Sequence, residues 1–187
     1  MNETKENEYI RKFTSENICF DAVKFHYGGR KAQRSGVPLI THIVEGLKIL
    51  TRIGTERVIN EAWCLHPIVQ SDGDLRSTLR RGFLVKLGNS HVQSILYAME
   101  YRAVANSYLS NMTVDIDDIR TKVNAFSGIH KMLIADKIQN WKDFSAQPKG
   151  TYDNEEILHK YFHSWCYDIL GLTESEVEGY MRLIDDR

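Results

Sequence analysis

Two histidines and one aspartate are the residues of this chain best suited to hold a divalent metal ion. His66 closes an apolar helical stripe that begins at Ile59, so its imidazole is predicted to face inward. Asp136 continues a stripe that begins at Ile129, where the pattern expects a hydrophobic residue. His42 lies in the first turn of a further stripe. Imidazole and carboxylate together suit Mn, Fe, Zn or a similar ion.

The inward position of Asp136 is the sharper of these signals. An ionised carboxylate that faces a core costs several kcal/mol unless something compensates its charge. We therefore expect Asp136 to be paired with a cation, bound to a metal, or less buried than its stripe implies. Spacing alone leaves the alternative open that His42 and His66 are core histidines with satisfied hydrogen bonds.

The elements that must position these residues are predicted to be helices, which makes the chain all-α. Apolar residues recur at helical spacing and no stretch alternates strictly. The pattern predicts a first helix from about Glu8 to Tyr27 and a basic helix from Leu75 to Lys86. Pro67 should bend or end the helix that carries His66. One further helix is expected to start after Pro38, one to run to about Tyr108, and one to start at Asp115. Others are expected at about Gly128–Phe144 and over Ile157–Ile169. A last helix is expected to start at Thr173, where Glu176 completes a capping box.

Composition sets limits on the class of protein. The chain has 187 residues, 42% hydrophobic and 26% charged, which fits one domain over residues 1–187. Its net charge of -1 argues against nucleic acid as a ligand. The polar N-terminus and the lack of a long apolar run predict no signal peptide or membrane span and a cytoplasmic location. The three cysteines have no C-x-x-C spacing and are expected to be reduced core thiols: Cys19, Cys64 and Cys166.

Three motifs occur in order along the chain: Arg34-Ser35-Gly36-Val37-Pro38 leading to His42, then Leu65-His66, then Ala135-Asp136 followed by Asn140. This layout resembles the hydrolase domain of RelA/SpoT-type enzymes. These belong to the HD-domain phosphohydrolases and remove the 3'-pyrophosphate of the alarmone (p)ppGpp with a manganese ion. The resemblance covers about residues 20–145. It implies an HD-domain helical bundle, on which we expect the C-terminal helices at 153–185 to pack.

Carried over by position, the resemblance implies three ligands for a manganese ion: His42, His66 and Asp136. It also implies three residues that meet the ligand, Arg34 and Ser35 at the nucleotide and Asn140 at its ribose or phosphate end. The expected ligand is a guanine nucleotide or another phosphorylated small molecule.

The departures from the family pattern lie at the positions that bind the metal and activate water in the family. Pro67 stands where the family has the aspartate of its His-Asp doublet, and Gln70 and Ser71 stand where it has an acidic pair that activates water. The loss of three negative charges weakens metal binding and removes the general base. Asp72 and Asp74 follow directly and are candidate substitutes.

Three hypotheses follow. The first is a degenerate HD-domain protein that binds a nucleotide or a protein partner with weak or no hydrolysis. The second is an active metal-dependent nucleotide phosphohydrolase with a rebuilt site. The third is a non-catalytic helical scaffold. His159 and His163 have metal-ligand spacing but are expected to be surface residues.

Overall fold

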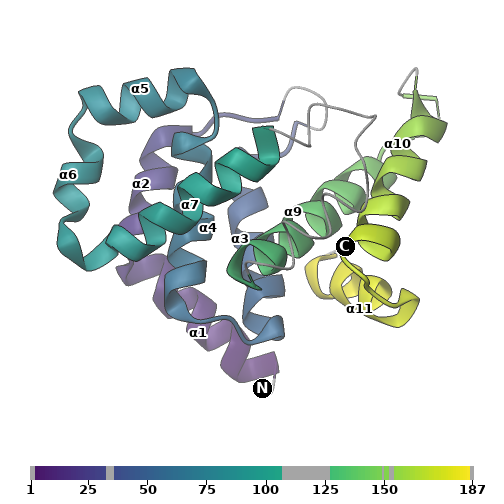
Figure 1. The fold of residues 1–187 in the computed structure, drawn as a ribbon. Coiled ribbons are helices and arrows are strands. Elements are labelled where there is room, and N and C mark those ends of the chain that lie inside the picture. The colour runs from purple at the N-terminus through teal and green to yellow at the C-terminus, as the bar shows by residue number, and fades with distance from the viewer. Residues whose placement is uncertain (1–2, 33–35, 107–126, 149, 152–153, 186–187) are drawn as a thin grey trace.

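The computed structural model describes residues 3–32, 36–106, 127–148, 150–151 and 154–185 (Figure 1). Over these residues the chain is helical without a strand, so the predicted all-α fold is confirmed. The elements are α1 (Glu3–Glu16), α2 (Ile18–Tyr27), α3 (Leu39–Ile53), α4 (Arg57–Val69), α5 (Asp72–Arg80), α6 (Phe83–Leu87), η1 (Asn89–His91), α7 (Val92–Val104), α9 (Ser127–Ser145), α10 (Glu155–His163), η3 (Ser164–Ile169) and α11 (Glu174–Ile184). The helix expected from Asp115 and the segment around Tyr108 lie outside the described residues.

Helix α4 lies at the centre of the bundle and contacts α2, α3, α5, α7 and α9. It packs tightly on α3 at Gly46, where an added Cβ would lie 2.2 Å from the indole of Trp63. The Trp63 Nε1 donates to the Ile43 carbonyl at 3.0 Å, which satisfies the polar atom of this fully buried ring. The absence of a side chain at Gly46 therefore allows the two helices that carry His42 and His66 to pack closely.

The single first helix predicted from Glu8 to Tyr27 is wrong, because the chain forms α1 and α2 with a break at Asn17. Asn17 is extended, and its Oδ1 accepts from the backbone N–H groups of Cys19 and Phe20. An asparagine side chain that caps a new helix competes with continuation of the old one. The predicted end of α2 is confirmed, since Gly28 adopts the left-handed conformation with φ of 51°.

One further boundary differs from the prediction. The helix predicted from Leu75 to Lys86 is divided by Gly82, whose φ of 62° ends α5 before α6 begins. Pro67, which is predicted to bend or end its helix, lies inside α4, and α4 continues to Val69.

The C-terminal helices pack on the bundle, with α10 against α9 and α11 against both α3 and α9. The capping box predicted at Thr173 and Glu176 is confirmed. All three cysteines are buried and unpaired, as expected, and His159 and His163 are exposed. Among the described residues, no helix is both long and apolar enough to cross a membrane.

Candidate functional site

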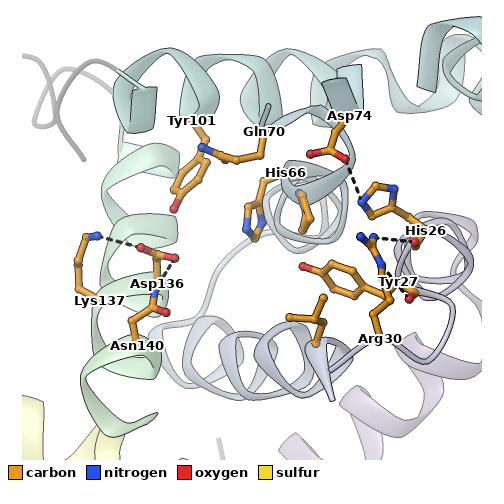
Figure 2. Close-up of a pocket in the computed structure, with 12 residues that line it drawn as sticks. His26, Tyr27, Arg30, His66, Gln70, Asp74, Tyr101, Asp136, Lys137 and Asn140 are labelled. Atoms are coloured by element: carbon orange, nitrogen blue, oxygen red, sulfur yellow. Dashed lines mark hydrogen bonds and ion pairs between the residues drawn. The ribbon is translucent and has the colours of Figure 1, made fainter. Parts of the chain in front are cut away.

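A pocket of about 400 Å³ opens between α2, α4, α7 and α9 (Figure 2). Side chains from all four helices line it, together with Arg30, Leu39, Gln70 and Asp74 from neighbouring segments. The helical residues are His26, Tyr27, His66, Pro67, Tyr101, Asp136, Lys137 and Asn140. In Figure 2, His66 faces the pocket from α4, and Asp136 faces it from α9 on the opposite wall. The fold thus brings His66, Asp136 and Asn140 to one cavity.

A second cavity of about 270 Å³ adjoins the first and shares Tyr27, Leu39, Asp136 and Asn140 with it. His42 and Gln139 line this second cavity. So do Ala32 and Val37, the residues on either side of the segment that carries Arg34 and Ser35. Arg34 and Ser35 themselves lie outside the described residues.

The imidazole of His66 is held in one tautomer by the backbone of its own helix. A proline has no N–H, so the Trp63 carbonyl loses the helical bond that residue 67 would otherwise donate. The Nδ1 of His66 lies 2.6 Å from that carbonyl and donates to it. Burial, reinforced by the nearby His42, lowers the pKa of His66 to about 3. The ring is therefore neutral at pH 7, and its Nε2 carries the lone pair.

The imidazole of His42 is held in the same tautomer by a chain of polar side chains. The amide nitrogen of Gln139 donates to Glu45 at 3.0 Å and to Asp143 at 2.8 Å, which identifies the other amide atom as oxygen. That oxygen lies 2.7 Å from His42 Nδ1, so Nδ1 donates to it. The Nε2 of His42 then faces Asp136 Oδ1 at 3.8 Å.

Both histidines therefore have the hydrogen-bonding pattern of metal ligands, in which the second ring nitrogen donates to a fixed acceptor. Their ring centroids are 5.6 Å apart. However, His42, His66 and Asp136 are not among the groups of described residues whose ligand atoms all lie within 4.8 Å of one another. A metal ion at this place would require the side chains to move inward.

Asp136 is buried and ionised, and its partner is a cation of the protein itself. The Nζ of Lys137 lies 3.0 Å from Oδ2, and the Asn140 amide donates to Oδ1 at 3.0 Å. Burial raises the pKa of Asp136, but the charge of Lys137 and its hydrogen bond to the carboxylate, with the two histidines nearby, outweigh that effect and hold the pKa below its usual value. Of the three expectations for this buried carboxylate, pairing with a cation is the one observed.

Lys137 is a residue of this site that the sequence analysis did not identify. It is 3% exposed, and its Nζ donates to the Tyr161 hydroxyl at 3.1 Å. The ammonium also lies 5.2 Å and 5.0 Å from the ring centroids of Tyr161 and Trp165. Burial opposes its charge, yet Asp136 and the Tyr161 hydroxyl raise the pKa of Lys137 above its ordinary value.

The residues at the family's acidic positions are divided between the pocket and the surface. Pro67 and Gln70 line the pocket, and neither offers a charged oxygen. Ser71 instead caps α5, because its Oγ accepts from the Asp74 N–H at 3.0 Å. Asp74 reaches the pocket and lies 3.5 Å from His26 Nε2. Asp72 does not line it, and its exposed carboxylate pairs with Arg102.

The formal charges that line the larger pocket balance. Arg30 and Lys137 are cations, and Asp74 and Asp136 are anions. Burial lowers the pKa of His26 in spite of the opposing effect of Asp74, so this ring contributes no charge at pH 7. A dication would therefore meet no excess of negative charge in this pocket.

Comparison of the chain with protein-family models, with curated proteins and with solved structures gave no match. The HD-domain resemblance therefore stays a prediction drawn from the sequence motifs.

Proposed function

We propose that this chain is a degenerate HD-type protein that binds a guanine nucleotide or another phosphorylated small molecule, with weak or no hydrolysis. The ligand occupies the pocket between α2, α4, α7 and α9. The observation that carries the proposal is the buried ion pair between Lys137 and Asp136. In it, a cation of the protein already compensates the carboxylate that a catalytic metal would use.

The energetic argument concerns a dication next to Lys137. An ion bound through His42, His66 and Asp136 would lie close to the ammonium that contacts the same carboxylate. At ~5 Å and an effective dielectric constant of ~20, the repulsion between a double and a single charge is roughly 7 kcal/mol. Pro67 and Gln70 supply no compensating carboxylate. These charges favour weak metal binding and little turnover.

The pocket offers groups that suit a phosphorylated ligand. Arg30 is held at the rim by bonds that its guanidinium donates to the His26 and Tyr27 carbonyls, at 2.9 Å and 3.2 Å. Three of its five N–H groups are not used in these two bonds and can meet phosphate oxygens. Tyr27 from α2 and Tyr101 from α7 add aromatic side chains to the lining of the same pocket. Arg34 adds a second guanidinium by resemblance.

The experiment is a calorimetric titration of the purified protein with GDP, GTP and ppGpp. We expect saturable binding of at least one of them, weakened tenfold or more (about 1.4 kcal/mol) by Arg30→Ala. Arg76→Ala is the matched control, because Arg76 is exposed on α5 and does not line the pocket. Absence of binding to the whole panel would contradict the proposed binding of a guanine nucleotide and favour the scaffold hypothesis.

One observation favours the second candidate, an active metal-dependent phosphohydrolase. The Nδ1 atoms of His42 and His66 both donate to fixed acceptors, which leaves both Nε2 atoms available to a metal. Elemental analysis combined with an assay for phosphate release separates the two candidates. Stoichiometric manganese, iron or zinc lost in His42→Ala, together with turnover of a nucleotide, would establish the active enzyme and contradict the degenerate one.

A further inference from the structure

A second group of possible metal ligands lies away from the pocket, where α2, α4 and η1 meet. Cys19 in the first turn of α2, Glu61 in α4 and His91 in η1 each offer one ligand atom, and these atoms all lie within 4.8 Å of one another. None of the three residues lines the pocket described above. We propose that Cys19, Glu61 and His91 form a binding site for Zn²⁺, with a water as the fourth ligand.

The distance between the nitrogen and oxygen ligands is close to the one that a tetrahedral zinc site requires, and the Cys19 sulfur lies within 4.8 Å of both. Zinc binds sulfur at about 2.3 Å and nitrogen or oxygen at about 2.0–2.2 Å, so two ligand atoms of one tetrahedron lie roughly 3.3–3.6 Å apart. His91 Nε2 and Glu61 Oε1 are 3.9 Å apart. This separation is too long for a hydrogen bond and only a few tenths of an ångström too long for two ligands of one ion.

The imidazole of His91 is oriented for this role. Its Nδ1 lies 3.0 Å from the Leu87 carbonyl, and a carbonyl only accepts, so Nδ1 carries the proton. In the neutral ring, Nε2 is then an acceptor that faces a carboxylate oxygen, which is also an acceptor. A cation placed between them satisfies both atoms. His91 is also the most exposed of the three side chains, which gives an ion and a water access from solvent.

Glu61 is held in place by three donors. The Asn17 amide donates to Oε1 at 3.1 Å, the Ser94 hydroxyl to Oε2 at 2.9 Å, and the Arg57 guanidinium to Oε1 at 2.8 Å. Asn17 and Ser94 are buried, so they keep the carboxylate oriented. Arg57 has a side chain 71% exposed and can turn into solvent when an ion takes its place. Arg57 is thus the exchangeable partner that competes with the metal.

Cys19 supplies the sulfur ligand of the site. Zinc binds the thiolate, so metal binding is coupled to release of the thiol proton to solvent.

The test uses Co²⁺ as a spectroscopic substitute for zinc in the purified full chain. A bound thiolate gives a charge-transfer band in the near ultraviolet, and we expect one equivalent of Co²⁺ to produce it and Zn²⁺ to abolish it. Cys19→Ala should remove the band, and His91→Gln, which removes a ligand, should weaken metal binding by at least the roughly 10–100-fold that loss of an outer partner of a ligand costs. Cys166→Ala is the matched control, because Cys166 is equally buried and lies outside the triad.

Two further variants sharpen the result. Arg57→Ala should tighten metal binding, because it removes the competing cation. If Cys19, Glu61 and His91 only stabilise the fold and bind no metal, the substitution should not increase metal affinity. Asp136→Asn should leave the band unchanged, which separates this site from the pocket and from the proposed nucleotide function. Absence of a thiolate band in the native chain, or its survival in Cys19→Ala, would overturn the proposal without reference to any other variant.

Discussion

Replacement of Lys137 by methionine tests the central ion pair of the pocket. Methionine keeps most of the length of the side chain and removes the charge, so Asp136 would keep a buried carboxylate without its cation. Removal of one partner of a buried pair typically costs about 3–5 kcal/mol. For a chain of this size, each kcal/mol corresponds to about 2–4 °C in Tm. We therefore expect Lys137→Met to lower Tm by roughly 6–20 °C.

The assay is urea unfolding at pH 7 in a double-mutant cycle with Asp136→Asn. The double variant lacks both charges and should recover much of the loss, because the uncompensated carboxylate is gone. Lys160→Met is the control for loss of an exposed lysine on α10, and it should change the free energy of unfolding by less than about 0.5 kcal/mol. If Lys137→Met costs under ~1 kcal/mol, or if the two substitutions are additive, the ion pair does not hold the site as we describe.

The ion pair between Lys137 and Asp136 makes the free energy of unfolding depend on pH in opposite directions at acid and at alkaline pH. The pKa of Asp136 is lowered in the folded chain, so its contribution is present above the ordinary aspartate pKa and is lost as pH falls through the folded value. The pKa of Lys137 is raised, so its contribution is present below the ordinary lysine pKa and is lost as pH rises through the folded value. The coupling energy should be flat from about pH 5 to 9 and should decline on either side.

Lys137→Met should also change the response of the pocket to metal. Without the ammonium, the repulsion that disfavours a dication is removed, so Mn²⁺ should bind more tightly than to the native chain. This gain should depend on His42 and His66, and it is a readout that loss of stability alone would not produce.

Three other substitutions test the elements around the site. His66→Leu should reduce the loss of stability at acid pH. A buried imidazole with a pKa of about 3 lowers the free energy of unfolding of the native chain by up to about 4–5 kcal/mol between pH 6.5 and pH 3. An unchanged pH dependence of urea unfolding in the variant would contradict the neutral, buried ring. Pro67→Asp should restore an N–H that competes for the Trp63 carbonyl, so nitrogen NMR should report a mixture of His66 tautomers, and a pure Nδ1–H form would contradict the role of the proline. Gly46→Ala should destabilise the chain by about 3 kcal/mol or more in thermal unfolding, because the new methyl group collides with the Trp63 ring, whereas Gly179→Ala in α11, with open space at its Cβ, should be neutral or stabilising.

The helical pattern was sufficient to predict the inward faces of α4 and α9, and with them the positions of His66 and Asp136. It could not predict the partner of Asp136, because Lys137 is enclosed by Tyr161, which is 24 residues further along the chain. Spacing along one helix carries no information about which ring of another helix will cover it. The sequence pattern predicts the aromatic stripe of α10, but it does not predict that this stripe encloses the Lys137 ammonium.

The orientation of the two imidazole rings was not predicted from the sequence either. The bond from Gln139 to Glu45 joins residues 94 positions apart, so the fixed tautomer of His42 depends on tertiary packing. The tautomer of His66 follows from a local rule, the missing N–H of Pro67, and was predictable in principle. The sequence motifs predict that Pro67 replaces a metal ligand and that it bends or ends its helix. In the structure it also releases the carbonyl that orients His66.

The predicted boundary of the first helix is wrong for a local reason. The break at Asn17 interrupts a long apolar pattern, and a capping residue inside such a pattern is hard to distinguish from a solvent-facing polar residue. The ligands Cys19, Glu61 and His91 come from three separate elements with no motif spacing, so only the packing of α2, α4 and η1 brings them together.

The most direct test of the account is one titration that follows binding and turnover together. The purified chain is titrated with ppGpp in buffer that contains Mn²⁺, with heat recorded during the titration and pyrophosphate measured in the same sample afterwards. The account predicts saturable binding that Arg30→Ala weakens, with little or no pyrophosphate released. Rapid release of pyrophosphate that is lost in His42→Ala would contradict it, because the buried Lys137–Asp136 pair would then have failed to exclude a catalytic metal.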